Sequence, residues 1–220
     1  MVDLIITGVV AALMIAICCA YLKYEAIKEK KSLIGILPKG IKQTLFGTGM
    51  ILSTILIFMV LFFLYDSSWV FAVKRIVLFT ALWPIAFIDY RKHIIPNKLL
   101  CFLLIVRLVI AIAEMICDFK SAKSELLSCL IAGAGIAIIL CIMRLIVKEG
   151  IGFGDIKLFA VMGLFLGVRG SIPSIFMSFV ISFFVSVYML ISKRKSRKDQ
   201  IAFAPSILVG TMLSIIFLGA

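Results

Sequence analysis

Long apolar stretches separated by short polar segments make up most of this chain. The apolar stretches cover residues 4–22, 44–65, 70–88, 98–116, 126–147, 156–170, 173–192 and 202–219. An α-helix of about 20 apolar residues crosses the hydrocarbon core of a bilayer, whereas strands of a membrane barrel show short alternating segments. We therefore predict an all-α, polytopic membrane helix bundle with about eight transmembrane helices.

The stretch 156–170 is the shortest of the eight, and the link that follows it, Gly170 to Pro173, is tight. Two spans joined so closely can also form one merged or re-entrant element, because irregular backbone is tolerated in a membrane where protein surrounds it. The sequence leaves this alternative open.

Composition agrees with a membrane protein, since 64% of the residues are hydrophobic and 15% are charged, against about half apolar in soluble domains. We expect a single membrane domain over 1–220. Within it, residues 1–69 form two N-terminal helices with a short basic loop, and residues 70–220 form the core. Lysines rather than a small-residue cleavage site follow the first stretch, so we expect it to stay as an anchor.

Basic side chains alternate between the connections. Sixteen of the 23 Lys and Arg residues lie in the connections 23–43, 89–98, 148–157 and 193–199. The positive-inside rule places these connections in the cytoplasm and both chain ends outside. Topology and attraction to membrane lipid therefore explain the net charge of +12. The sequence shows no basic stretch with interleaved aromatic residues of the kind that binds nucleic acid.

Cysteine and histidine give no indication of a metal site. The six cysteines lie in or at the ends of apolar stretches without a CxxC pair, and the single histidine, His93, lies in a basic loop where we read it as solvated. Zinc sites need several such ligands at short spacing. We expect no metal and no cofactor.

Two of the eleven carboxylates stand apart from the charged loops. Asp89 follows WPIAFI at the end of the third stretch, and Asp155 follows GIGFG at the start of the sixth. A carboxylate at the membrane boundary is a functional candidate, although a helix cap is the simpler alternative for each. Gly152 and Gly154 leave the backbone around Phe153 open to a close approach by an extended substrate.

Three stretches together resemble the type IV prepilin peptidases, intramembrane aspartic proteases of the GxGD type. Gly152–Leu158 reads GFGDIKL and is similar to the G-x-G-D-x-K-L signature of that family. Asp89–Asn97 resembles its first-aspartate motif, in which Ile-Pro-Asn follows several residues after the aspartate, and Ile201–Pro205 resembles its I-P-F-G-P stretch. The resemblance covers about 70–220 in the same order.

The resemblance implies an aspartic endopeptidase of the cell membrane. Its substrates would be type IV prepilins or pseudopilin-like membrane proteins, whose short basic leader is removed at the cytoplasmic face. The sequence itself carries no indication of an oligomeric state. The residues implied as catalytic are Asp89 and Asp155, and those implied as substrate-binding are Gly152, Phe153, Gly154, Lys157, Ile95, Pro96, Asn97 and Pro205.

Two carboxylates in one water-accessible cleft do not both ionise easily, so Asp89 and Asp155 would share a proton. One would act as the general base on water while the other donates to the scissile carbonyl oxygen. Asp155 opens one helix and Asp89 ends another, and the helix dipoles would favour Asp155 as the base.

Two departures from the family pattern are visible. Ala202 and Ala204 stand where proline and glycine are usual in the third motif. Larger bacterial members carry a cysteine-rich insert after the first helix, linked to N-methylation, whereas residues 23–42 of this chain contain no cysteine. We therefore do not expect methyltransferase activity.

Other functions compete with this interpretation. A transporter could use Asp89 and Asp155 as an ion or proton relay, and a non-catalytic pilus assembly factor is a second alternative. Transporters typically have broken helices at the midplane and repeat symmetry, whereas here the two acids lie near the cytoplasmic face and no repeat is evident. A presenilin-like protease would show Tyr-Asp at the first aspartate, whereas this chain has Asp89-Tyr90. Arg107, deep in its stretch, is expected to pair with Glu114 about two turns away.

Overall fold

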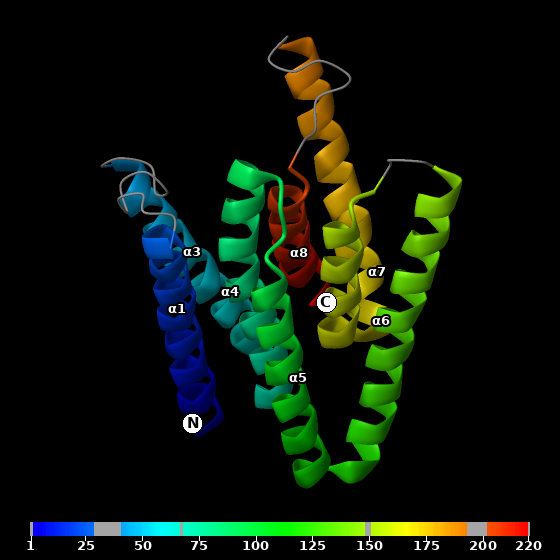
Figure 1. The fold of residues 1–220 in the computed structure, drawn as a ribbon. Coiled ribbons are helices and arrows are strands. Elements are labelled where there is room, and N and C mark those ends of the chain that lie inside the picture. The colour runs from blue at the N-terminus through cyan, green and yellow to red at the C-terminus, as the bar shows by residue number, and fades with distance from the viewer. Residues whose placement is uncertain (1, 29–40, 67, 148–150, 193–201, 220) are drawn as a thin grey trace. The chain divides into compact units, whose positions relative to one another are not determined.

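The computed structural model describes residues 2–28, 41–66, 68–147, 151–192 and 202–219. These residues form helices and no strand, which confirms the all-α prediction (Figure 1). The helices are α1 (Val2–Lys28), α3 (Ile41–Met59), the π-helix η1 (Val60–Leu64), α4 (Trp69–Lys92), α5 (Asn97–Cys117), α6 (Phe119–Ile146), α7 (Phe153–Ile191) and α8 (Ala204–Leu218).

Six of these helices are long and apolar enough to cross a membrane: α1, the region Gly47–Leu64, and α4 to α7. The last apolar stretch forms α8, which at 15 residues is shorter than the roughly 20 residues that span a bilayer. Stretches 156–170 and 173–192 both fall within α7, which consists of two helical parts on either side of a non-helical residue, Gly167. Most of the basic connections 23–43 and 193–199 lie outside the described residues.

The structure divides into two units within α4, between Pro84 and Ile85. The first unit contains α1, α3, η1 and the start of α4. Inside it, the Cys18 thiol donates to the Thr80 carbonyl over 3.6 Å, and the indole N–H of Trp83 donates to Ser53 Oγ over 3.1 Å. Each of these bonds connects α4 to an earlier helix of the unit.

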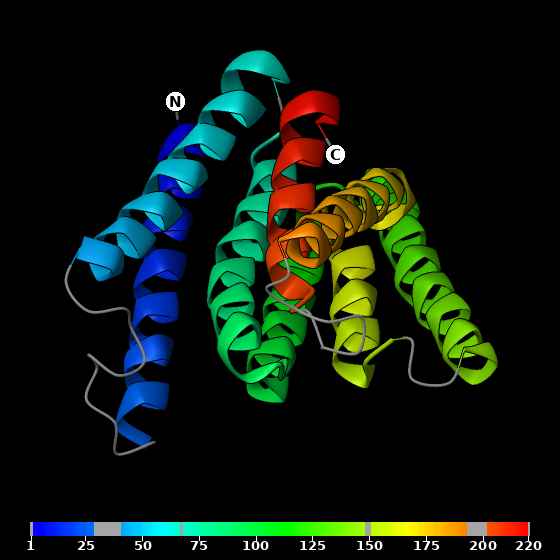
Figure 2. The same cartoon turned by 90° about the horizontal axis from the view of Figure 1, so that it is seen from above.

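The second unit, residues 85–220, contains every residue of the candidate site. Its central feature is a break in α7 at Gly167, whose φ of 65° and ψ of −174° are not helical. Figures 1 and 2 show the yellow part of α7 before this break and the orange part after it running in different directions. The sequence predicted the tight link at Gly170–Pro173, but the break lies a few residues earlier. Gly167 has the positive φ, and Pro173 lies inside the helix.

Helices α6 and α7 approach each other closely at two glycines. A Cβ placed on Gly163 of α7 would lie 2.8 to 2.9 Å from the backbone of Ala132 and Gly133 in α6. Such distances are too short for any side chain, so hydrogen at Gly163 is what lets the two backbones pack together. Close packing at small residues is how helices associate in membranes, where lipid and side chains are equally apolar.

Replacing Gly163 with alanine should therefore destabilise the helix pair. We expect Gly163→Ala to lower the free energy of unfolding by about 1–3 kcal/mol, because overpacking forces the backbones apart. The measurement is thermal unfolding of the detergent-solubilised protein. Gly135→Ala is the matched control, since a Cβ there meets nothing within 4 Å, and equal stability of the two variants would contradict the prediction.

Candidate active site

Asp89 lies in the last turn of α4, and its carboxylate is buried. The residue is 5% exposed, and Oδ2 accepts a hydrogen bond from the backbone N–H of Ala204 over 2.9 Å. Ala204 is the first residue of α8, where N–H groups have no partner within the helix. The carboxylate therefore caps α8, and this bond fixes its orientation.

The bond between Asp89 and Ala204 bears on which aspartate helix dipoles would favour as the base. Asp89 lies at the C-terminal end of α4 and also at the N-terminal end of α8. Asp155 lies in the first turn of α7. Both aspartates thus face the N-terminus of a helix, so helix dipoles do not assign one as the base and the other as the acid.

Asp155 is positioned by the glycine turn before it. Gly152 precedes the first turn of α7 with extended backbone angles, φ −68° and ψ 143°. A Cβ on Gly152 would lie 3.0 Å from Asp155 Oδ2, so the carboxylate bends back over a residue that has no side chain. The absence of a side chain at Gly152 therefore leaves room for the carboxylate of Asp155.

The two aspartate motifs contact each other directly. A Cβ on Gly154 would lie 3.1 Å from Cβ of Ile95, so the start of α7 packs tightly on the turn between α4 and α5. The Lys157 ammonium donates to Asn97 Oδ1 over 3.2 Å. Residues about 60 positions apart in sequence are thereby held as one surface.

A pocket of about 300 Å³ lies at this junction and contains both aspartates. The residues that line it are Asp89, His93, Ile94, Ile95, Asn97, Gly152, Phe153, Gly154, Asp155 and Lys157. The pocket brings together all the predicted site residues except Pro96 and Pro205. Asp89 and Asp155 thus face the same pocket from α4 and α7.

The two prolines lie beside this pocket. Pro96 precedes α5 with φ −73° and accepts hydrogen bonds from the N–H groups of Leu99 and Leu100, so it starts that helix. Pro205 lines a second, mainly apolar pocket of about 390 Å³. The lining of that pocket is Tyr90, His93, Ile181, Val185, Met189, Ala202, Pro205, Ser206 and Val209.

Sequence reasoning missed two residues of the site. His93, read as a solvated loop residue, is exposed but also lines both pockets, and its φ of 52° marks the end of α4. Arg144 of α6 donates to the Ile151 carbonyl, and its guanidinium lies 3.7 Å from the ring centre of Phe153. The sequence position of His93, inside the Asp89–Asn97 motif, could have indicated that it belongs to the site. No feature of the sequence indicated that Arg144 contacts the glycine turn.

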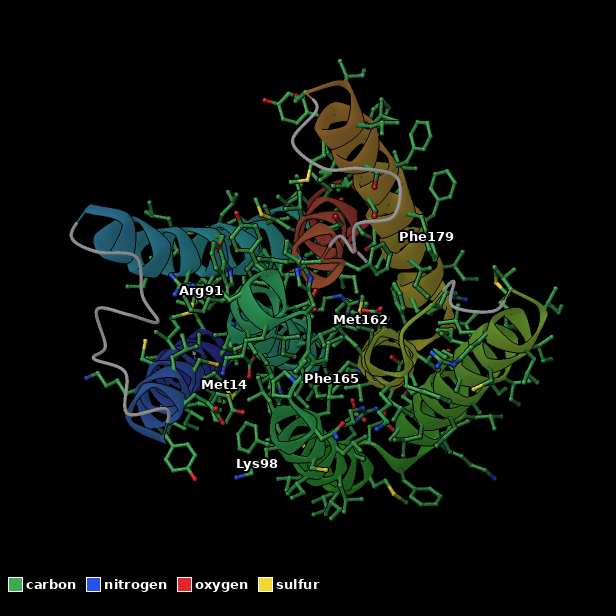
Figure 3. All side chains as sticks on the ribbon, turned by 45° about the horizontal axis from the view of Figure 1, so that its top comes forward. Met14, Arg91, Lys98, Met162, Phe165 and Phe179 are labelled. Carbon is green, nitrogen blue, oxygen red and sulfur yellow. The ribbon has the colours of Figure 1, made fainter. Side chains whose placement is uncertain are left out.

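Three aromatic rings support the start of α8 beside Asp89. The ring centres of Phe159, Phe179 and Phe203 lie 5.4 to 5.9 Å from one another. Phe179, labelled in Figure 3, belongs to the orange part of α7, while Phe159 belongs to the part that carries Asp155. The cluster therefore connects both parts of α7 to the residue before Ala204.

The arrangement can act on water. A pair of interacting carboxylates in a pocket can take a proton from a water molecule and give one to a substrate oxygen. Among the described residues, no group of three His, Cys, Asp or Glu side chains could hold a metal ion. Acid–base chemistry by the two carboxylates is what these residues fit.

Comparison with known proteins adds independent information. The family model described as Type IV leader peptidase family matches residues 76–187. Two curated relatives are each named "Prepilin leader peptidase/N-methyltransferase". The one from Bacillus subtilis is 32% identical over 142 residues, which are 64% of this chain and 54% of the relative. The one from Xanthomonas campestris pv. campestris is 28% identical over 119 residues, 54% of this chain and 40% of the relative.

The chain thus spans about half the length of these curated relatives, or less. No solved structure gives a significant match.

The packing of Gly154 on Ile95 predicts a disulfide between cysteines placed at these two positions. Disulfide-bonded residues have Cβ atoms about 3.5–4.5 Å apart, slightly more than the 3.1 Å found here. In a variant without native cysteines, we expect Ile95→Cys/Gly154→Cys to form the bond on mild oxidation, measured by mass spectrometry of the linked peptides.

Ile94→Cys/Gly154→Cys is the control, because the neighbouring residue Ile94 is 63% exposed and the three atoms nearest to a Cβ on Gly154 all belong to Ile95. Equal linkage of both pairs, or no linkage at position 95, would contradict the geometry.

Proposed function

Because this chain belongs to the type IV leader peptidase family, we propose that it is an aspartic endopeptidase acting on type IV prepilins or pseudopilin-like membrane proteins. It removes their short basic leader. The observation that carries the proposal is that Asp89 and Asp155 line one pocket together with the Ile95–Asn97 turn and the Gly152–Gly154 turn. Methyltransferase activity, which the names of the curated relatives include, is not part of the proposal.

The reaction is hydrolysis of one peptide bond. One carboxylate takes a proton from water while the water oxygen attacks the scissile carbonyl carbon, and the partner carboxylic acid donates its proton to the carbonyl oxygen. The resulting diol collapses when the carboxyl group that accepted a proton gives it to the amide nitrogen, the partner carboxylate takes a proton from one hydroxyl of the diol, and the C–N bond breaks. The new carbonyl forms, and the pair again holds one proton. The single proton shared at the start belongs to the pair, so Asp89 and Asp155 work as a unit.

Both carboxylates are oriented before substrate arrives. Asp89 is held by the N–H of Ala204, and Asp155 is fixed by the Gly152 turn. Groups that already stand in a productive geometry need no reorganisation in the transition state. This orientation supports a catalytic role for the two aspartates. Helix capping alone does not explain why they line the same pocket, because a cap needs no second carboxylate nearby.

The leader would bind in extended form across the two turns, Gly152–Asp155 and Ile95–Asn97. Extended backbone exposes its peptide bonds to the carboxylates, whereas a helix hides them. The acidic pair also complements basic residues of a leader. By the distribution of Lys and Arg, the pocket faces the cytoplasm from a multi-pass protein of the cell membrane, with both chain ends outside.

Neutralising either aspartate should stop cleavage. We expect Asp89→Asn and Asp155→Asn each to lower the cleavage rate at least about 10³-fold while insertion in the membrane stays normal, because an amide keeps the shape but loses the shared proton. Co-expression with candidate prepilins and a gel shift of the cleaved product measures this.

Asp118→Asn is the matched control. Asp118 is an exposed residue that caps α6 by accepting from the N–H groups of Lys120 and Ser121, and asparagine caps helices equally well. Near-normal cleavage by either Asp89→Asn or Asp155→Asn would refute the catalytic pair.

The position of the cut follows from the topology. We expect the new N-terminus of the product to lie at the cytoplasmic end of the substrate's apolar segment, directly after the basic leader. Mass spectrometry of the product gives the cut, and labelling of cysteines placed at positions 92 and 157 from either side of the membrane gives the orientation. A cut at the opposite end of the apolar segment, or labelling only from outside, would overturn this part of the proposal.

A further inference from the structure

The α7 break, meaning Gly167 and the residues on either side of it, bends the helix sharply. Phe159 and Phe179 are 20 residues apart and would be separated by about 30 Å in a straight helix. Their ring centres lie 5.9 Å apart. The part of α7 after the break therefore folds back beside the part that carries Asp155, as Figure 1 also shows.

Only glycine fits at the break. The φ of 65° and ψ of −174° lie in a region that residues with a side chain avoid. A Cβ at this position would also lie 3.0 Å from Ser128 Oγ. The bend is thus specified by the sequence at one position.

A bend of this kind separates two backbone groups that a continuous helix would pair. In an α-helix the N–H of Val168 donates to the carbonyl of Leu164. Here the Val168 N–H instead donates to Ser128 Oγ of α6 over 3.1 Å, and the Leu164 carbonyl accepts from Arg107 Nε of α5 over 2.7 Å. Side chains of two other helices take over both halves of the missing bond.

Arg107 is itself held in place. Its Nη1 donates to Glu114 Oε2 over 3.0 Å, which holds the guanidinium, whereas its Nη2 makes only a weak bond to Cys129 Sγ at 3.5 Å. Arg107 and Glu114 are 5% and 7% exposed. Glu114 balances the charge, and the planar guanidinium reaches the carboxylate and the Leu164 carbonyl at the same time, which a single ammonium group does not do in the same geometry.

The bend matters for the site on both sides of the break. The part before it, residues 153–166, carries Asp155 at its start and packs on α6 through Gly163. The part after it supplies Ile181, Val185 and Met189 to the apolar pocket beside Pro205. A change of angle at Gly167 would move these two sets of residues relative to each other.

We propose that Arg107 and Ser128 are positioning residues for the reaction, which fix the bend of α7 by pairing with the Leu164 carbonyl and the Val168 N–H, and so hold Asp155 in register with Asp89. The cleavage part of this inference rests on the proposed peptidase function. The bend itself does not, and it is measured separately.

The experiment compares Ser128→Ala, which removes the acceptor of Val168, with Arg107→Lys, which keeps a positive charge beside Glu114 but loses the planar fork. We expect each to lower kcat for prepilin cleavage about 100-fold, the loss typical of a displacement of roughly 1 Å, with KM unchanged. Cys129→Ala is the matched control. It removes a contact of Arg107 that satisfies no backbone group, and we expect wild-type kinetics.

The second readout is the distance between spin labels at positions 157 and 191, introduced as unnatural amino acids and measured by pulsed electron spin resonance. A straight helix would separate these positions by about 50 Å. We expect a single, shorter distance in the wild type and in Cys129→Ala, and a longer or broader distribution in Ser128→Ala and Arg107→Lys. The paired variant Arg107→Met/Glu114→Leu, which leaves no unbalanced charge, should behave as Arg107→Lys does.

Loss of kcat together with a changed distance would support the positioning role. Wild-type kcat in Ser128→Ala and Arg107→Lys, or a loss of kcat with unchanged distances, would overturn it. A wild-type protein that cleaves no prepilin would instead refute the proposed function, while the distances would still test how the bend is held.

Discussion

Backbone N–H and C=O groups within a membrane need hydrogen-bond partners inside the protein, because lipid offers none. In α7 this requirement meets a glycine, Gly167, whose backbone angles break the helix. Ser128 and Arg107 satisfy two of the backbone groups that the break separates, the Val168 N–H and the Leu164 carbonyl. The fold of the second unit depends on these side chains, which replace backbone groups as hydrogen-bond partners. They allow α7 to bend, so that it provides both the segment with Asp155 and the segment that packs on α8.

The same requirement explains how Asp89 is buried. A carboxylate inside the protein is tolerated when donors surround it, and the free N–H at the start of α8 is such a donor. The bond between Asp89 and Ala204 therefore serves two purposes, because it caps α8 and orients the carboxylate. Asp155 is positioned in a different way, by the absence of side chains in the turn before it. The two carboxylates reach one pocket from helices that the break in α7 and the contacts of α6 hold in register.

Much of this arrangement was predictable from the sequence. The apolar stretches predicted a helical membrane protein, and the resemblance of Asp89–Asn97 and Gly152–Leu158 to known motifs selected residues that line one pocket. The pairing of Arg107 with Glu114 was predicted from their spacing and is confirmed at 3.0 Å. These features are local or repeat over a few turns, so the sequence alone carries them.

Other features depend on contacts between distant segments. Nothing in the order of residues distinguished Gly167 from Gly170 as the position of the break, because both glycines allow a positive φ. The described residues contain six helices long and apolar enough to span a membrane, against about eight predicted stretches, because a bent helix and two separate helices look alike as apolar stretches. The contact of Asp89 with Ala204 joins residues 115 positions apart, and that of Arg144 with the Ile151 carbonyl is made by a side chain that reads as an ordinary interfacial arginine.

We propose that substrate is cut between Asp89 and Asp155 in the pocket that both line. A prepilin peptide in which a hydroxyl-bearing, non-hydrolysable group replaces the scissile bond, with a photoreactive side chain beside it, tests this most directly. After irradiation of the membrane-embedded protein, mass spectrometry should find cross-links to residues 93–97 and 152–157, and Asp89→Asn should reduce them. Cross-links that fall only on other helices, or that are equally strong in Asp89→Asn, would show that substrate does not bind between the two aspartates.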